Sequence, residues 1–379
     1  MHIAYVSDLD ARDVHSWSGS TYRMWRGLED AGAKIDLITP LKLPHPLWYR
    51  TKRRWNTLRR RTHSSNGEPA VLRAYAKQVQ QMIRLLPKEP DAIFGCGKPP
   101  VAFLETDIPL IFADDYSVPA MKRSHPSAAR LSRKSYEQLL AAEQQLLSRA
   151  SLAIYASDWA ADAARQTYDV EPDKVIAIPW GANLDCDRSE EDVERLIASR
   201  SRDRLTILFN GVSWEGKRGA LVLETVKLLH EQGISVELHI LGCDPPVPVP
   251  GYVFVHGFIS KANSAGQDKI NTLYNMAHLL FVPTKADAYG IVFAEASSFG
   301  VPSISTAVGG VSGVVYEGQN GHLLCLEAGP KDYASLIQEI RNDRTRYREL
   351  ARQSFQTYKR QLNWQVFGEK VLDFLRELD

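Results

Sequence analysis

The chain has 379 residues, of which 44% are hydrophobic and 24% charged, and at roughly 150 residues per domain this length predicts two globular domains. The formal net charge of +1 excludes a basic field that attracts nucleic acid, and no apolar run approaches the ~20 residues of a membrane-spanning helix. The N-terminus, MHIAYVSDLDARD, turns polar too early for a signal peptide, and four scattered cysteines without metal-ligand spacing indicate reduced thiols in a cytoplasmic protein.

The first predicted unit of structure is a strand at 2–8, a loop at 9–21, a helix at 22–32 and a strand at 34–40. This β–loop–α–β order is typical of doubly wound sheets. In the loop, Gly19 stands between Ser18 and Ser20, and small residues there allow backbone to approach a ligand. The alternative is an ordinary turn, because the spacing is not that of a dinucleotide fingerprint.

Residues 48–61, WYRTKRRWNTLRRR, form the strongest charge cluster, with seven Arg or Lys among fourteen residues and interleaved aromatic residues. A basic, aromatic helix can lie on an anionic membrane surface. It can equally grip a phosphorylated or lipid-linked acceptor. The alternative is a solvated helix face followed by a loop.

The rest of the first half continues the alternation of strands and helices. Its predicted elements are a helix at 71–86, strands at 90–97 and 108–117, a helix at 132–150, a strand at 151–157, a helix at 157–168 and a closing segment at 173–185. Asp114 and Asp115 fall where the strand at 108–117 ends. Ligands of parallel sheets bind at the carboxyl ends of strands, so these carboxylates are candidate site residues.

A charged segment at 186–204 predicts a domain junction and a surface helix, after which the pattern restarts. Strands are predicted at 205–211, 236–242, 252–260, 278–284, 301–310 and 313–324, and helices at 220–233, 268–277, 291–299, 331–342 and 364–378. The fold class is therefore α/β, with two Rossmann-like doubly wound domains facing a central cleft. Interfaces between domains favour ligand sites.

Three loops of the second half carry the chemistry. The loop Gly211–Gly219, GVSWEGKRG, offers backbone approach and places Lys217 at a helix start, which suits a phosphate. The second loop runs from Asp287 to Glu295, and the third contains Gly309 and Gly310. Taken singly, Lys217 is a solvated loop lysine, Asp287 an N-cap and Glu295 a solvated helix charge. Their convergence favours a nucleotide diphosphate sugar, with amides for phosphate and carboxylates for hydroxyls.

The stretch DAYGIVFAEASSFGVP at 287–302 resembles the carboxylate-x7-Glu signature of the retaining family four glycosyltransferases (glycosyl transferases group 1), which have the GT-B fold. GVSWEGKRG is similar to that family's Lys loop, and VGGVSGVVYEGQNGHLL is similar to its glycine-rich tail. IPWGANLD resembles the interdomain segment, and Ser18-Gly19-Ser20 resembles the N-terminal glycine loop. The resemblance runs over nearly the whole chain, in order.

The resemblance implies two domains: 1–183 for the acceptor and 184–361 for the nucleotide sugar, with the helix at about 362–379 packing back on the first. It implies that Lys217 contacts the donor diphosphate, Glu295 the ribose and Asp287 the transferred sugar. The other implied donor contacts are Gly19, Ser20, Gly211, Arg218, Phe258 and Ile259 beside the base, and the backbone of Tyr289, Gly290 and Ile291.

Three positions depart from the family pattern. Asp287 replaces a glutamate and has a shorter arm, and Val212 and Ser213 occupy a region where an arginine is common, which leaves the diphosphate to Lys217 and Arg218. Asp114 or Asp115 stands where a histidine is frequent. An aspartate there could orient the acceptor hydroxyl or the donor sugar, and we assign Asp114 to the catalytic set.

The function that follows is retaining, metal-independent hexosyl transfer from a nucleotide diphosphate sugar, linked to uridine or guanosine diphosphate, to a hydroxyl of a glycan, lipid-linked or small-molecule acceptor. No cofactor and no nucleic acid are expected, and residues 48–61 would give peripheral contact with the inner membrane surface. The alternatives are a nucleotide-sugar epimerase of the same fold and a catalytically idle sugar-nucleotide-binding protein. A periplasmic-type binding protein is disfavoured by the expected lack of a signal sequence.

Overall fold

The computed structural model describes residues 1–43, 64–124, 128 and 131–378. The chain divides into two compact units, which consist of Met1–Pro179 with Trp364–Asp379, and of Trp180–Asn363. We call them the N-terminal and the C-terminal unit. The predicted basic segment 48–61 lies outside the described residues.

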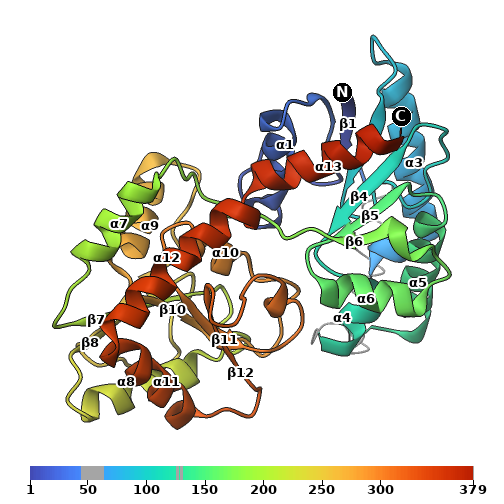
Figure 1. Ribbon diagram of the computed structural model, residues 1–379. Coiled ribbons are helices and arrows are strands. Elements are labelled where there is room, and N and C mark those ends of the chain that lie inside the picture. The colour runs from blue at the N-terminus through green and yellow to red at the C-terminus, as the bar shows by residue number, and fades with distance from the viewer. Residues whose placement is uncertain (44–63, 125–127, 129–130, 379) are drawn as a thin grey trace. The chain divides into compact units, whose positions relative to one another are not determined.

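The N-terminal unit is built on a six-stranded parallel sheet in the order β2-β1-β3-β4-β5-β6 (Figure 1). Its strands are β1 (His2–Val6), β2 (Lys34–Ile38), β3 (Ala92–Cys96), β4 (Leu110–Asp114), β5 (Leu152–Tyr155) and β6 (Val175–Ala177). Its helices are α1 (Ser20–Asp30), α3 (Pro69–Arg84), α4 (Val118–Ser124), α5 (Arg133–Leu147), α6 (Asp158–Thr167) and α13 (Trp364–Leu378).

The C-terminal unit repeats the plan with a six-stranded parallel sheet in the order β12-β11-β10-β7-β8-β9. Its strands are β7 (Leu205–Asn210), β8 (Val236–Leu241), β9 (Val253–Gly257), β10 (Leu279–Val282), β11 (Ser303–Thr306) and β12 (Gly321–Leu324). Its helices are α7 (Glu190–Ser199), α8 (Gly219–Glu231), α9 (Ser264–Met276), α10 (Ile291–Ser297), α11 (Pro330–Asn342) and α12 (Arg344–Gln361).

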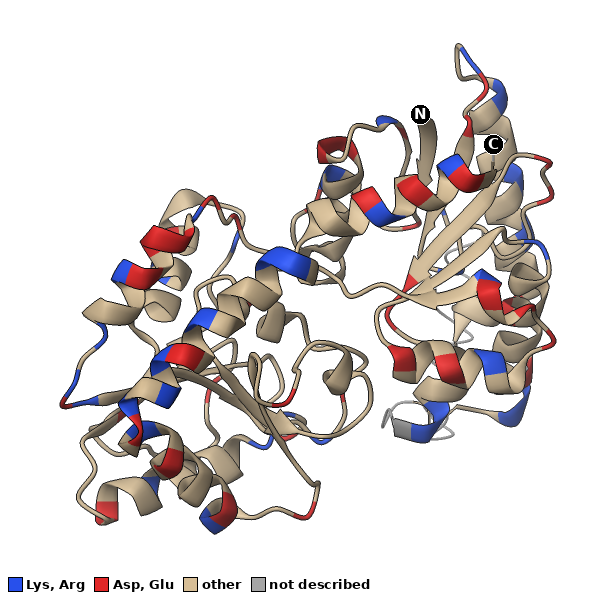
Figure 2. Cartoon of the chain, in the orientation of Figure 1, with Lys and Arg blue, Asp and Glu red and all other residues tan. Residues whose placement is uncertain are grey.

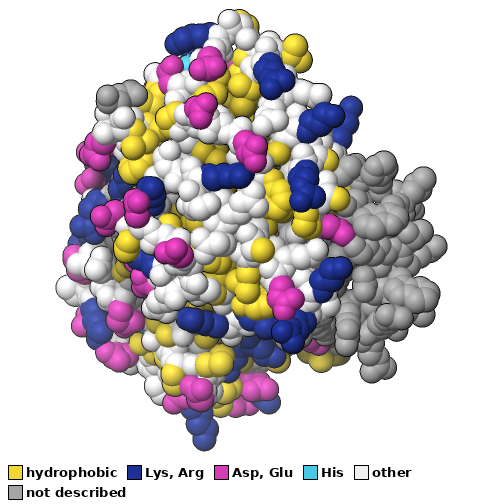
Figure 3. All heavy atoms as spheres, turned by 90° about the vertical axis from the view of Figure 1, so that its right-hand side faces the viewer, with side chains coloured by type: hydrophobic (Ala, Val, Ile, Leu, Met, Phe, Trp, Pro, Cys, Tyr) yellow, Lys and Arg dark blue, Asp and Glu magenta, His cyan; other side chains and the backbone are white. Residues whose placement is uncertain are grey.

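The sequences of the strands explain why both sheets are covered by helices. Strands such as LAIY and LLFV are apolar throughout and fully buried, as expected for parallel strands packed on both faces. Charged residues are frequent along the helices, and the central strands contain few of them (Figure 2). On the face shown in Figure 3, basic and acidic side chains are interspersed, in keeping with the net charge of +1.

Each sheet contains a point where the strand order reverses. In the C-terminal unit this switch point lies between β7 and β10, and in the N-terminal unit it lies between β1 and β3. Connections on the two sides of a switch point cover opposite faces, which leaves a crevice at the carboxyl ends of the two strands. The predicted α/β class with two Rossmann-like domains is confirmed.

Some element boundaries differ from the prediction. Helix α4 was not predicted, because its seven residues offer too few turns for a periodic pattern. Helix α9 begins at Ser264, where Asn263 caps it by accepting from Gly266 N at 2.8 Å. Helix α10 spans seven residues and ends at Ser297, two residues before the predicted end. In the part of the chain that the structure describes, no helix is long and apolar enough to cross a bilayer.

Helix α13 packs on α1 through two glycines (Figure 1). A Cβ on Gly368 would lie 2.3 Å from the carbonyl oxygen of Gly27, and a Cβ on Gly27 would lie 2.3 Å from that of Trp364. Neither position has room for a methyl group. The two backbones therefore approach more closely than helices with side chains at the crossing can.

We predict that Gly368→Ala weakens the docking of α13. Overpacking at this contact is expected to lower the free energy of unfolding by about 2 kcal/mol. Helix propensity alone would favour alanine over glycine by about 1 kcal/mol. A loss of stability would therefore come from the close contact. Hydrogen–deuterium exchange should become faster in α13 and α1. Gly251→Ala is the control, because a Cβ there meets no atom within 4 Å. Unchanged exchange in Gly368→Ala would contradict the packing described.

His278 connects the starts of β7 and β10. Its Nδ1 accepts the backbone N–H of Thr206 at 3.0 Å, which fixes the proton on Nε2, and Nε2 donates to Ser201 O at 2.8 Å. The pKa of His278 is lowered to about 4, chiefly by burial; the charge of Arg200 adds to this shift, and the hydrogen bond to Ser201 opposes it. The imidazole is therefore neutral in the folded protein at neutral pH.

This depressed pKa predicts a pH dependence of stability. Between pH 6.5 and about pH 4 the unfolded chain binds a proton that folded His278 does not, so stability falls as the pH falls through this window. At about 1.4 kcal/mol per pKa unit, the contribution is about 3 kcal/mol. In His278→Asn, the free energy of unfolding should depend less steeply on pH in this window. In His230→Asn, which changes an exposed histidine, the pH dependence should equal that of the wild type. Parallel slopes in all three proteins would refute the assignment.

Candidate active site

The loops that follow β7 and β10 meet at the switch point of the C-terminal unit. The backbone N–H of Lys285 donates to Gly216 O at 2.9 Å, and Thr284 Oγ1 donates to the same carbonyl at 3.3 Å. Two of the three loops singled out in the sequence are thus tied together by hydrogen bonds. The strand order explains this contact, because β7 and β10 are neighbours.

Lys217 and Asp287 form an ion pair between these loops, from Lys217 Nζ to Asp287 Oδ2. The side chains are 20% and 16% exposed, so the pair is shielded but reachable from solvent. Gly211 leaves room for the lysine, since a Cβ at that position would lie 2.8 Å from Lys217 Cγ. Asp287 is not the N-cap of α10; that residue is Gly290, with φ of 93° and no side-chain cap.

The third loop supports Asp287 from its other side. Gly310 N donates to Asp287 O at 3.1 Å. Gly309 has φ of 57°, and a Cβ on it would lie 2.1 Å from the same carbonyl oxygen. Only glycine fits such a left-handed position against backbone. All three predicted loops therefore converge on the Lys217–Asp287 pair.

Helix α10 follows this pair and is anchored by Tyr289. The tyrosine ring is buried, and its hydroxyl donates to Trp180 O at 2.8 Å. Burial raises the pKa of Tyr289 well above its usual value. The side chain is thus a neutral anchor, and it holds the backbone of Gly290 and Ile291 at the start of α10.

Glu295 is a buried charge rather than a solvated one, and its side chain has 0% exposure. It pairs with Lys261 Nζ and accepts from Tyr274 Oη at 3.2 Å, and Tyr274 Oη accepts in turn from Asn210 Nδ2 at 3.0 Å. Burial raises the pKa of Tyr274 well above its usual value, and the charge of Glu295 adds to the shift. The sequence reading missed Lys261, which lies in a loop without a glycine motif, 34 residues from its partner.

Other residues predicted to bind the donor are placed as follows. Phe258, after β9, is 69% exposed, and Ile259 beside it is half-buried. Arg218 is the left-handed cap of α8, with φ of 55°, and its guanidinium donates to Leu326 O and Ala328 O at 3.1 Å each. Arg218 therefore holds the loop after β12, and its guanidinium is engaged with backbone carbonyls. No group of three or more His, Cys, Asp or Glu among the described residues could hold a metal ion.

In the N-terminal unit, a buried charge cluster lies at the carboxyl ends of β3 and β4. Lys98 Nζ is 3.1 Å from Asp114 Oδ2 and 3.3 Å from Glu143 Oε1. Burial opposes the charged lysine, but Asp114 and Glu143 outweigh it and raise the pKa of Lys98. The tyrosines Tyr155 and Tyr168 donate to Glu143 at 2.7 and 2.5 Å. The cluster borders a cavity of about 240 Å³.

Asp115 differs from its neighbour Asp114. Asp114 is engaged with Lys98, whereas Asp115 Oδ1 is buried without a hydrogen-bond partner among the described residues. Burial raises the pKa of Asp115 well above its usual value, and the charge of Asp114 raises it further, while a hydrogen bond from Trp17 opposes the shift. Trp17, Ser18 and Gly19 all have positive φ, and Gly19 caps α1 ahead of the buried Ser20. This backbone is strained, as functional loops often are.

The sequence of the C-terminal unit is similar to that of known proteins. Residues 204–343 match the profile of the family described as glycosyl transferases group 1. A D-inositol 3-phosphate glycosyltransferase of Thermomonospora curvata is 25% identical over 236 residues, which are 56% of this chain and 54% of that protein. The same enzyme of Corynebacterium diphtheriae is 22% identical over 254 residues, 62% of this chain and 58% of its own. The chain thus spans somewhat more than half the length of these relatives.

Solved structures share the whole architecture. Sucrose-phosphate synthase from Thermosynechococcus elongatus has a TM-score of 0.70 at 16% identity, with 100% of this chain and 98% of that chain covered. Anabaena HepE in complex with UDP-glucose has a TM-score of 0.63 at 15% identity, with 100% of both chains covered. These matches confirm the predicted GT-B fold. Beyond the fold, the similarity to the glycosyl transferases group 1 lies in residues 204–343, within the C-terminal unit.

We predict that Lys261→Met destabilises the C-terminal unit, because Glu295 is left as a buried charge without a partner. The expected loss in the free energy of unfolding is about 3 kcal/mol, measured by chemical denaturation. Adding Glu295→Gln to this variant should restore part of the loss. Lys227→Met, on an exposed pair with Glu231, should change stability by less than about 0.5 kcal/mol. Equal stability of the single and double variants would show that Glu295 does not depend on Lys261.

Proposed function

We propose that the protein is a retaining glycosyltransferase, which moves a hexosyl unit from a nucleotide diphosphate sugar to a hydroxyl acceptor. The observation that carries this proposal is the pairing of Lys217 with Asp287 at the switch point, eight residues before the buried Glu295. A shielded cation between two loop backbones suits a diphosphate. The match of residues 204–343 to glycosyl transferases group 1 supports the same reading.

Donor binding would exchange the partners of the Lys217–Asp287 pair. The diphosphate would take the ammonium of Lys217, and the freed carboxylate of Asp287 would accept hydrogen bonds from hydroxyls of the sugar. The exposed ring of Phe258 offers a surface on which the base can stack. Because HepE is solved with UDP-glucose, uridine diphosphate sugars are the first donors to test, ahead of guanosine diphosphate sugars.

The ribose contact proposed for Glu295 involves Lys261. Because the side chain of Glu295 has 0% exposure beneath this lysine, ribose hydroxyls can reach the carboxylate only if Lys261 turns away from it. The side chain of Lys261 is 23% exposed, so it reaches solvent. Its ammonium would then be available to the ribose or to a phosphate of the same donor.

The acceptor would bind to the N-terminal unit, at the cavity beside Lys98 and Asp114. Asp114 lines this cavity and pairs with Lys98, and it would orient the acceptor hydroxyl or the donor sugar. The acceptor class is a hydroxyl of a glycan, of a lipid-linked sugar or of a small molecule.

The chemistry requires no strong side-chain base. The acceptor oxygen attacks the anomeric carbon on the face from which the diphosphate leaves, so the bond to the diphosphate breaks as the new glycosidic bond forms. The hydroxyl proton passes to an oxygen of the leaving nucleoside diphosphate. Lys217 stabilises the charge that grows there, which is the largest contribution expected of the protein. We propose that no metal is required; activity that chelators abolish and magnesium restores would overturn this point.

We predict that Lys217→Ala lowers kcat by about 100-fold or more, because the leaving diphosphate loses its fixed cation. The assay is transfer from UDP-glucose and related donors to an acceptor panel, with circular dichroism and the thermal midpoint as checks of folding. Lys227→Ala, on the exposed face of α8, is the matched control and should keep full activity. Undiminished transfer by a folded Lys217→Ala protein would end the assignment.

The same donors incubated without an acceptor separate the other candidate functions. A transferase leaves the sugar unchanged or hydrolyses it slowly, whereas an epimerase converts it. A binding protein without activity would raise its thermal midpoint with nucleotide sugars but form no product with any acceptor.

A further inference from the structure

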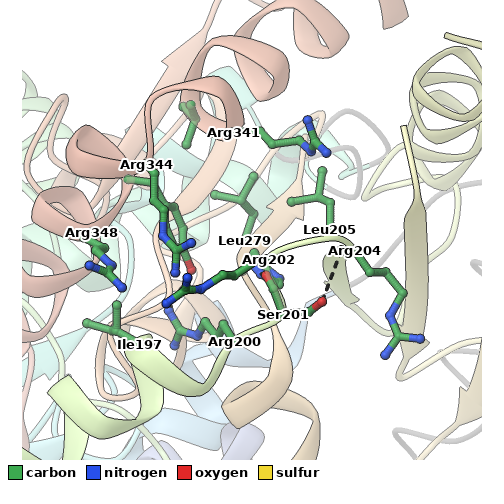
Figure 4. A pocket seen from close by; sticks show the side chains of 13 residues that line it. Ile197, Arg200, Ser201, Arg202, Arg204, Leu205, Leu279, Arg341, Arg344 and Arg348 are labelled. Carbon is green, nitrogen blue, oxygen red and sulfur yellow. Dashed lines mark hydrogen bonds between the residues drawn. The ribbon is translucent and has the colours of Figure 1, made fainter. Parts of the chain in front are cut away.

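A second basic pocket lies at the opposite end of the C-terminal sheet from the donor loops. It adjoins Leu205 and Leu279, the first residues of β7 and β10, and its volume is about 80 Å³. Six arginines from two distant segments line it: Arg200, Arg202, Arg204, Arg341, Arg344 and Arg348 (Figure 4). The donor loops follow the carboxyl ends of the same strands. The two sites are therefore separated by the length of strands β7 and β10.

The positive charge of this pocket is not balanced by acidic side chains. Arg204 is paired with Glu237 at 3.0 Å. Among the described residues, no carboxylate forms an ion pair with Arg202, Arg344 or Arg348. Arg348 is near Arg344, and neither has the bidentate partner that Arg352 has in Glu194. The pocket is therefore a concentration of like charges.

The like charges of this cluster also act on the exposed Arg344. Loss of solvent lowers the pKa of the Arg344 guanidinium, and the charges of Arg202 and Arg348 lower it further. In Figure 4 the guanidinium groups of Arg200, Arg202 and Arg344 gather on one side of the pocket, while Arg204 and Arg341 point away. Charges of one sign gathered in this way lower stability unless an anion lies between them.

The wall of the pocket is a fixed structure. Arg200 is 5% exposed, and its guanidinium donates to Gly300 O and Phe299 O at 2.7 Å each and to Tyr347 Oη at 3.0 Å. Its Nε is buried and has no partner among the described residues. His278 is neutral, and its Nε2 proton is used by Ser201 O. Neither the partners of Arg200 nor the neutral His278 supplies a negative charge to the pocket.

We propose that this pocket binds a phosphate group, at a site separate from that of the donor diphosphate. Guanidinium groups match phosphate oxygens in pairs and are less strongly hydrated than ammonium groups. A volume of about 80 Å³ holds one such group and excludes a nucleoside, since pockets for larger ligands measure about 300 Å³ or more. The phosphate comes from a free phosphate or phosphomonoester, or from a phospholipid headgroup, and the remainder of the molecule stays outside.

The test compares two double variants of equal charge. Arg344→Gln/Arg348→Gln removes two pocket arginines, and Arg195→Gln/Arg376→Gln removes two exposed arginines from α7 and α13. Binding of inorganic phosphate is measured by calorimetry at constant ionic strength, and by the rise of the thermal midpoint. We expect at least tenfold weaker binding in the pocket variant and unchanged binding in the control.

Lys217→Ala separates this site from the donor site, and should bind phosphate as the wild type does at the pocket. Without phosphate, the pocket variant should be at least as stable as the wild type, since repulsion is relieved. A second arm measures sedimentation with vesicles of phosphatidylcholine with and without phosphatidic acid. If the pocket variant loses binding only to the vesicles that contain phosphatidic acid, the site is assigned to a lipid headgroup.

Three outcomes would overturn the proposal. In the first, the wild type binds neither phosphate nor vesicles that contain phosphatidic acid. In the second, both double variants lose phosphate binding equally. In the third, Lys217→Ala abolishes phosphate binding while the pocket variant retains it. None of them depends on transferase activity, so the proposed function stands or falls separately.

Discussion

The strand order of the C-terminal sheet is the constraint on which its candidate site depends. Because β7 and β10 are neighbours while their connections lead to opposite sides, the loops that follow them must meet at one edge. Lys217 and Asp287 are the side chains that this geometry brings into contact. Gly309 completes the arrangement, since any side chain there would displace the backbone of Asp287.

Buried charge is handled in two different ways in this chain. Glu295 and Lys98 each lie beside opposite charges and tyrosine or asparagine groups, so that their desolvation is compensated within the fold. Among the arginines beside His278, Arg204 pairs with Glu237, but Arg202, Arg344 and Arg348 have no carboxylate partner in the described part of the chain. This contrast distinguishes charge that stabilises the fold from charge that is set aside for a ligand.

Much of the architecture was predictable, because strands and helices alternate with clear periods and glycine marks the loops between them. The three loops of the C-terminal unit were recognised from their glycines, Lys217 and the carboxylates, and the pairing of β10 with β7 explains why the first two meet. Burial was not predictable. Glu295 has the sequence context of a solvated helix charge, and its 0% exposure depends on Lys261 and Tyr274, which reach it from other elements.

The arginine pocket shows the same limit. Residues 186–204 indicate a charged junction and a surface helix when only the sequence is considered. Arg202 and Arg344 line the same pocket because α12 lies near the start of β7, although more than a hundred residues separate them in the sequence. Motif spacing cannot predict a contact between residues so far apart. Arg218 is a related case, because its partners are the backbone carbonyls of Leu326 and Ala328. Every residue has such a carbonyl, so the residue types at these positions do not predict the contact.

The place of α13 has a consequence for the order in which the chain acquires its structure. Residues 180–363 leave the ribosome before Trp364 does, so the N-terminal unit must wait for its last helix until the whole C-terminal unit has been synthesised. Until then the face of α1 around Gly27 is uncovered. Domains generally fold as they emerge, and here the unit that is begun first is completed last. A nascent chain stalled within the C-terminal unit would therefore expose apolar surface on a domain that is otherwise folded.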